Sequence, residues 1–164
     1  MPELPEVNTL AIALNYQLSG DCFISAKTYT SCLRVPVPSE KEFASFFGIK
    51  IKQVFRKAKY VYFDFGLKQF IRVHLGMTGF FYLEDHSYSK KRHDHWFAGL
   101  ASGRFLVFND QRKFGRIEIV DHLINDVPEP LADQIDETCF LKVCSRSKRP
   151  VSYTHLTLPT MRIV

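Results

Sequence analysis

The sequence predicts a mainly β protein, an antiparallel β-sandwich of about eight strands with an N-terminal helix and a second short helix. Two observations predict this fold. From Ile49 to Val120, short apolar runs alternate with turn residues such as Gly66, Gly76 and Ser102-Gly103, a spacing typical of sandwiches and barrels. Before Gly20, apolar residues instead recur at helical spacing.

Length and composition set further limits. The chain has 164 residues, of which 46% are hydrophobic, so one domain with an appendage is expected. A formal net charge of +5 and a pI near 9.0 favour a polyanionic partner. The four cysteines form no CxxC pair and have no adjacent His at zinc-ligand spacing, so we expect reduced thiols in a cytosolic protein. No signal peptide or membrane-spanning run is evident, which predicts a soluble intracellular protein.

The N-terminal helix is predicted to run through Leu18 and to stop at Ser19-Gly20. Glu3 and Glu6 lie at its start, three residues apart and therefore on one face, so both carboxylates can address the same volume near the Pro2 nitrogen. A second short helix is predicted after Ser39, which forms a capping box with Glu42.

The predicted strands share short length and turn residues at their ends. They cover residues 21–29, 49–56, 60–65, 69–75, 79–83, 95–100, 104–109 and 116–120.

Pro2 offers unusual chemistry. If Met1 is removed, the chain begins with a secondary amine, and an α-amino group has a pKa near ~7.7–8.0, so part of it is neutral and nucleophilic at physiological pH. Such an amine can attack an aldehyde-level carbon and form an iminium, with Glu3 and Glu6 as acid and base. The same residues also suit an ordinary helix start, and residue types alone favour that simpler interpretation.

Three loops carry basic or exposed apolar residues. Residues 56–60 form a basic turn with Lys59 just before a strand, and residue types alone favour an ordinary solvated turn there. Gly76 and Gly79 bracket an exposed hairpin loop with Met77 at its tip, which either fills the gap left by a flipped base or folds back on the core. Residues 109–116 combine three basic residues with Phe114, a set that can pair with an orphaned base and stack in the duplex.

The Arg92-His93-Asp94-His95 segment resembles a metal-ligand cluster at first sight. We expect His93 and His95 to alternate at the start of a strand, with their rings on opposite faces. The segment therefore predicts no metal site.

Four of these segments, at residues 1–7, 56–60, 74–79 and 109–116, resemble the formamidopyrimidine-DNA glycosylase and endonuclease VIII family of base-excision repair enzymes. The presence of Met77, Arg112 and Phe114 together is similar to the formamidopyrimidine-DNA glycosylase branch. Lys113 replaces the commoner second arginine, which keeps the charge and loses the planar fork.

The resemblance implies a bifunctional DNA glycosylase and abasic-site lyase that removes oxidised purines, such as 8-oxoguanine and formamidopyrimidines, and nicks the strand by β,δ-elimination. The residues it implies to be catalytic are Pro2 as nucleophile, Glu3, Glu6 and Lys59. The residues it implies to bind DNA are His74, Met77, His93, Arg112, Lys113 and Phe114.

The resemblance also implies the partner and the setting. The partner would be double-stranded DNA with oxidised bases or abasic sites, bound by a monomer in the bacterial cytosol or nucleoid, away from membranes. No cofactor is expected in this chain, because the family's zinc belongs to a zinc finger beyond the residues that match. The alternative, from another class, is a non-catalytic nucleic-acid-binding β-sandwich module.

The resemblance divides the chain into three parts. Residues 1–126 would form the catalytic sandwich, and residues 127–150 the linker and the start of an α-helical, helix-two-turn-helix second domain. Residues 151–164 are unlike the family and are expected not to be native. We therefore expect a truncated fragment with impaired activity.

Overall fold

The computed structural model describes residues 2–124. The predictions for residues 127–150 and 151–164 lie outside this part, as do Cys139 and Cys144. Within it, Cys22 is half-buried and Cys32 is exposed, and both are free thiols. None of the helices in the described residues is long and apolar enough to cross a membrane.

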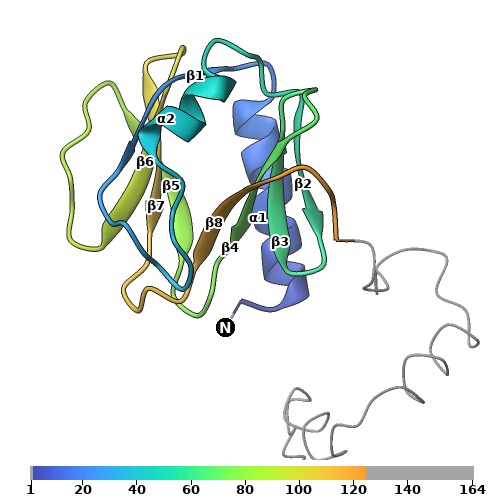
Figure 1. Cartoon of the computed structure of the whole chain (residues 1–164), viewed down its shortest axis with the longest axis vertical. Coiled ribbons are helices and arrows are strands. Elements are labelled where there is room, and N and C mark those ends of the chain that lie inside the picture. Colours follow the sequence, from blue (N-terminus) through green and yellow to red (C-terminus); the bar gives the residue numbers. More distant parts are fainter. Residues whose placement is uncertain (1, 125–164) are drawn as a thin grey trace, which may run out of the picture. The chain divides into compact units, whose positions relative to one another are not determined.

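Within residues 2–124, eight strands form two four-stranded antiparallel sheets, which confirms the predicted sandwich (Figure 1). The first sheet has the order β1-β6-β7-β5 and the second the order β2-β3-β4-β8. The strands are β1 (Phe23–Thr28), β2 (Gln53–Lys57), β3 (Tyr60–Asp64), β4 (Phe70–His74), β5 (Phe80–Asp85), β6 (Asp94–Leu100), β7 (Arg104–Asn109) and β8 (Arg116–Val120).

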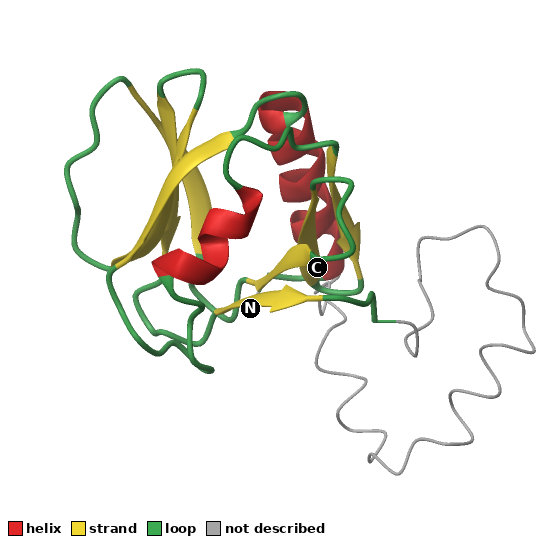
Figure 2. Ribbon diagram, turned by 45° about the horizontal axis from the view of Figure 1, so that its top comes forward, coloured by secondary structure: helices red, strands yellow, loops and turns green. Residues whose placement is uncertain are grey.

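The helices come from the N-terminal part of the chain and pack against the sheets. Helix α1 (Leu4–Leu18) packs against β2 and β3 (Figure 2), and its buried stripe is Val7, Ala11, Leu14 and Leu18. It ends at the predicted residue. Helix α2 (Glu40–Phe43) and the 3-10 turn η1 (Ala44–Phe46) contact β1, and Ser39 and Glu42 form the predicted capping box.

Aromatic rings from both sheets meet in the core. Phe23 on β1 lies 6.0 Å from the ring of Trp96 in its own sheet and 6.3 Å from the ring of Phe63 in the other sheet. All three side chains are almost fully buried. Since burying each such ring stabilises the fold by about 1.5–3 kcal/mol, this contact fixes the two sheets against each other.

Two local predictions were wrong. The strand predicted from residue 49 begins only at Gln53, because residues 47–51 pair irregularly with residues 20–23 through contacts such as the Ile51 N–H to Asp21 carbonyl bond of 2.7 Å. The Gly76 to Gly79 segment is not a hairpin loop, because β4 and β5 belong to different sheets. It crosses the edge of the sandwich, where it can meet loops from both sheets.

Candidate active site

The first turn of α1 holds the two predicted carboxylates in different roles. Glu3 is the N-cap residue, outside the helix, and its backbone N–H donates to the Glu6 carboxylate at 2.9 Å. The two residues form a capping box, so Glu6 is engaged by the backbone next to half-buried Pro2. The carboxylate of Glu3 also contacts another element.

Lys59 brings the β2–β3 turn to the N-terminus. Its Nζ donates to Glu3 Oε2 at 2.9 Å, although the two residues are 56 positions apart. Ala58 has φ of 51°, which turns the chain tightly enough to place Lys59 before β3. The hydrogen bond from Lys59, and then its charge, hold the pKa of Glu3 below its usual value. Glu3 is therefore a carboxylate at neutral pH, paired with a cation.

His74 lies at the end of β4, against the ring of Tyr60 at 4.9 Å between centroids. Its Nδ1 accepts the backbone N–H of Gly76 at 3.0 Å. Burial, together with the charges of Arg116, Arg34 and Lys59, lowers the pKa of His74. The neutral ring therefore carries its proton on Nε2, a hydrogen-bond donor without a charge.

An open pocket of about 650 Å³ lies beside His74. Five of the predicted DNA-binding residues line it, namely His74, Met77, Arg112, Lys113 and Phe114. Met77 and Phe114 are large apolar side chains left 41% and 40% exposed, and the Arg112 guanidinium stacks on the Phe114 ring at 4.8 Å. The structure thus gathers the predicted apolar wedge and its cations around one opening.

Gly76 allows the two loops of this pocket to touch. It has φ of 67°, and a Cβ placed there would lie 2.5 Å from the backbone carbon of Phe114 and 2.6 Å from the nitrogen of Gly115. Only a residue without a side chain permits this approach. Met77 and Phe114 are therefore carried by loops in direct backbone contact.

The buried side chain of Asp110 fixes the β7–β8 loop, which carries Phe114. Its role was missed by the sequence analysis. It is fully buried, and its Oδ2 accepts the N–H of Gly115 at 2.7 Å while Oδ1 accepts the Thr78 hydroxyl and the N–H of Arg112. An aspartate in a basic loop suggests a turn former, and only the distant partner Thr78 identifies it as a buried anchor. Lys113, in this loop, has φ of 57°.

Arg34 was also missed, because its loop carries no motif. It lines the same pocket, its backbone N–H donates to the Gly115 carbonyl at 3.2 Å, and its charge acts on His74. No ion pair within residues 2–124 involves its guanidinium. The pocket therefore has a third arginine or lysine available to an anion.

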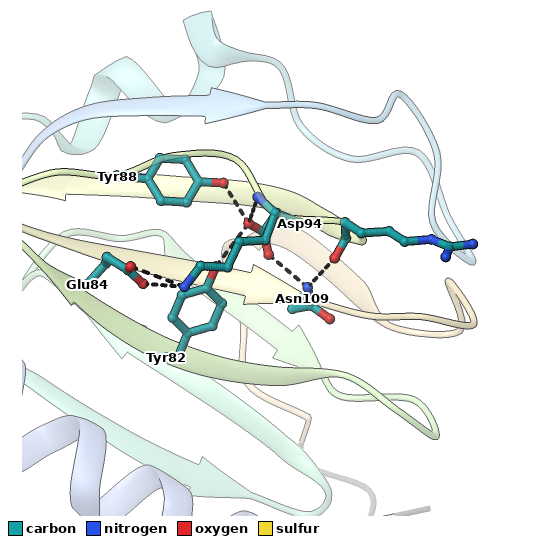
Figure 3. Close-up of polar contacts among 7 residues, drawn as sticks. Tyr82, Glu84, Tyr88, Asp94 and Asn109 are labelled. Carbon is teal, nitrogen blue, oxygen red and sulfur yellow. Dashed lines mark hydrogen bonds and ion pairs between the residues drawn. The ribbon is translucent and has the colours of Figure 1, made fainter.

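His93 does not line this pocket, and its predicted place on a strand was wrong. Strand β6 begins at Asp94, and His93 lies in the preceding turn with φ of 70°. His95 is buried, with Nε2 at 2.8 Å from the Asp110 carbonyl oxygen. Asp94 lies between them in a cluster of polar side chains with Tyr82, Tyr88 and Asn109 (Figure 3).

Comparisons with known proteins give one family. The profile described as the formamidopyrimidine-DNA glycosylase N-terminal domain matches residues 1–117. The formamidopyrimidine-DNA glycosylase of Chloroflexus aurantiacus is 34% identical over 158 residues, which are 92% of this chain and 56% of that protein. The protein of the same name from Rickettsia bellii is 36% identical over 143 residues, 83% of this chain and 52% of the relative. The chain thus spans about half the length of these relatives.

Two solved structures of similar fold are complexes with DNA. The Lactococcus lactis formamidopyrimidine-DNA glycosylase bound non-covalently to DNA with an abasic site matches with a TM-score of 0.66 and 29% identity, over 73% of this chain and 45% of that one. The same enzyme bound to DNA with an N7-benzyl-Fapy-dG lesion gives a TM-score of 0.65 and 30% identity, over 73% and 44% of the two chains.

Proposed function

Because this chain belongs to the formamidopyrimidine-DNA glycosylase family, through its N-terminal domain, we propose that it carries the catalytic groups of a DNA glycosylase and abasic-site lyase for base-excision repair. The substrate is double-stranded DNA with oxidised purines or abasic sites, bound by a monomer without a cofactor in this part of the chain. The observation that carries the proposal is the 2.9 Å contact of Lys59 with Glu3, next to Pro2. The rival non-catalytic module is not favoured, because the relatives described above are glycosylases.

The nucleophile is the Pro2 amine, after removal of Met1. It attacks C1′ of the flipped nucleotide as the bond from C1′ to the base breaks, and the base leaves with the electron pair of that bond and takes up a proton from water. Loss of the amine proton and protonation of O4′ then open the sugar to an iminium. Removal of a C2′ proton expels the 3′ phosphate, and removal of the C4′ proton then expels the 5′ phosphate.

The ionised state of Glu3 suits the role of base. Paired with Lys59, Glu3 is a carboxylate in the free protein, so it can accept the proton of the Pro2 ammonium. To pass that proton to O4′ as a general acid, its pKa has to rise when bound DNA excludes water from the carboxylate. Glu6, which caps the helix through the Glu3 N–H, orients this first turn.

The pocket supplies the DNA contacts of the proposal. Met77 and Phe114 occupy the gap that the flipped nucleotide leaves, and Arg112 pairs with the orphaned base. His74 donates from Nε2 to a phosphate, with Lys113 and Arg34 as nearby cations. Their shared opening supports the interpretation that they act on one duplex.

Borohydride trapping tests the nucleophile. The chain with Met1 removed, as verified by intact mass, is incubated at low salt with duplexes that contain 8-oxoguanine or an abasic site, because phosphate contacts are strongest there. Reduction of the iminium should give a covalent adduct that peptide mapping places on Pro2. Pro2→Gly should lose most of the adduct and keep DNA binding. An adduct on a lysine instead, or none with either duplex, would refute the assignment.

A further inference from the structure

The loop between β5 and β6, residues 86–93, has a basic end that lies outside the pocket beside His74, which we call the lesion pocket. Lys90, Lys91 and Arg92 are three consecutive exposed cations that precede His93. In Figure 1 the loop is drawn in yellow-green along the left side of the first sheet. Neither Lys90 nor Arg92 takes part in the site described above.

Asp94, the first residue of β6, directly follows this loop. Its side chain is only 2% exposed, and it accepts four hydrogen bonds, from the hydroxyls of Tyr82 and Tyr88 at 2.9 Å each, the N–H of Lys91 at 2.7 Å and Nδ2 of Asn109 at 2.8 Å (Figure 3). Burial alone would raise the pKa of Asp94, but these hydrogen bonds outweigh it and lower the pKa. The negative charge of Asp94 is thus buried, whereas the exposed residues 90–92 at the end of the loop are all cationic.

Two of the three cations are already engaged. Lys91 Nζ pairs with Glu84 at 2.8 Å, and Lys90 Nζ lies 4.9 Å from the centre of the Tyr29 ring. No ion pair in the described part of the chain engages Arg92, yet its backbone carbonyl is fixed by Asn109 Nδ2 at 2.9 Å. Arg92 is therefore a solvent-facing guanidinium on an ordered backbone.

The loop is joined to the lesion pocket through β7. Asn109 fixes Arg92, and the next residue, Asp110, donates its backbone N–H to the His93 carbonyl at 3.0 Å. The Asp110 carboxylate in turn holds the N–H groups of Arg112 and Gly115. Asn109 and Asp110 together thus set the position of the β5–β6 loop relative to the loop that carries Arg112 and Phe114.

We propose that Arg92, which precedes the expected DNA contact His93 in the β5–β6 loop, contacts a backbone phosphate of the same DNA duplex outside the lesion pocket, and that Asp94 is the residue that positions it. The inference rests on the proposed function only in taking duplex DNA as the partner. A guanidinium fork matches phosphate oxygens, and a loop fixed before binding loses less entropy on association. Such a contact aligns the duplex without reading its sequence.

Salt dependence of binding tests the role of Arg92. Binding of the full chain to a labelled undamaged duplex is measured by fluorescence anisotropy between about 50 and 200 mM salt, where each phosphate contact contributes about 0.9 to the slope of log affinity against log salt. Arg92→Ala should lower the slope by about 0.9, so its affinity deficit should be about 3.5-fold larger at the lower salt. Lys68→Ala is the matched control. It removes a positive charge from the β3–β4 turn, which lies outside the β5–β6 loop, and it should leave the slope unchanged.

A double-mutant cycle tests the role of Asp94. Asp94→Asn should lower the slope in the wild-type background and have no further effect in Arg92→Ala, because it acts through the arginine. Tyr88→Phe removes one of the four hydrogen bonds and serves in the same cycle if Asp94→Asn does not fold, as judged by circular dichroism. Additive effects of the two substitutions would refute the positioning role.

Other outcomes separate this inference from the proposed reaction. An unchanged slope in Arg92→Ala, an equal loss in Lys68→Ala, or no duplex binding by the wild-type chain at the lower salt would overturn the inference. Trapping at Pro2 is measured separately. A lowered slope in Arg92→Ala without any adduct would support the second phosphate contact and refute the reaction.

Discussion

The ion pair of Lys59 with Glu3 makes the proposed chemistry depend on a turn that is distant in the sequence. Lys59→Met keeps the length of the side chain and removes the charge that lowers the pKa of Glu3. The acid limb of the pH–rate profile for trapping should therefore move to higher pH, because Glu3 becomes protonated earlier. Lys68→Met, at the other end of β3, should leave the limb in place, and an acid limb that does not move in Lys59→Met would contradict the role of the pair.

His74 gives a pH dependence of stability whose sign is fixed by the direction of its shift. The folded pKa is lowered, whereas the unfolded value is about 6.5, so between the two values the unfolded chain binds more protons. The contribution is complete above about pH 6.5 and is lost as the pH falls through the lowered pKa. Urea unfolding from pH 8 to pH 5 should show this loss in wild type and in His86→Gln. His74→Gln should show a smaller loss, and an equal one would refute the assignment.

Several of the residues that matter were beyond sequence reasoning. The resemblance of their loops to a known family singled out Met77, Arg112 and Phe114, and the structure places all three around one pocket. Arg34 could not be predicted, because its loop carries no motif. Asp110 could not be predicted either, because its buried carboxylate is recognised by a partner, Thr78, that meets it only in the fold. The same holds for Asp94, whose four donors come from different segments.

At the level of elements, Gly76 joins the β4–β5 and β7–β8 loops. Gly76→Ala combines a left-handed conformation, which costs a side chain about 1–2 kcal/mol, with a Cβ only 2.5 Å from the Phe114 backbone. We expect a loss of more than about 2 kcal/mol in the free energy of unfolding and weaker DNA binding. Gly66→Ala is the matched control, because Gly66 has φ of 72° with nothing within 4 Å of the added Cβ. Equal losses in the two variants, measured by urea unfolding, would show that the close approach is unimportant.

Element boundaries were predictable where local chemistry decides them. Helix α1 ends at Leu18, and β7 and β8 cover the predicted residues, because Gly residues and polar turns interrupt the apolar pattern there. The start of β2 was not predictable, since Ile49 and Ile51 continue the apolar pattern while the backbone of Ile51 bonds to Asp21. The assignment of β4 and β5 to different sheets likewise depends on long-range pairing, which a local pattern of alternation does not contain.

At the level of the whole molecule, the two sheets should unfold together because Phe23 contacts rings of both. Phe23→Ala should lower the free energy of unfolding by about 3–5 kcal/mol, whereas Ile24→Ala, at the neighbouring 57% exposed position, should change it by about 0.5 kcal/mol or less. Trp96, the single tryptophan, lies next to Phe23 and reports the transition by fluorescence. Fluorescence and circular dichroism transitions that do not coincide in wild type would contradict unfolding as one unit.

Lys113 has a left-handed backbone conformation, which lowers stability locally. A lysine at φ of 57° is held in a conformation that glycine adopts more easily, so the loop keeps a local cost in exchange for a cation at the mouth of the pocket. Selection for stability alone would favour loss of this side chain, and selection for binding would retain it. Position 113 is therefore a place where stability and charge at the mouth of the pocket favour different residues.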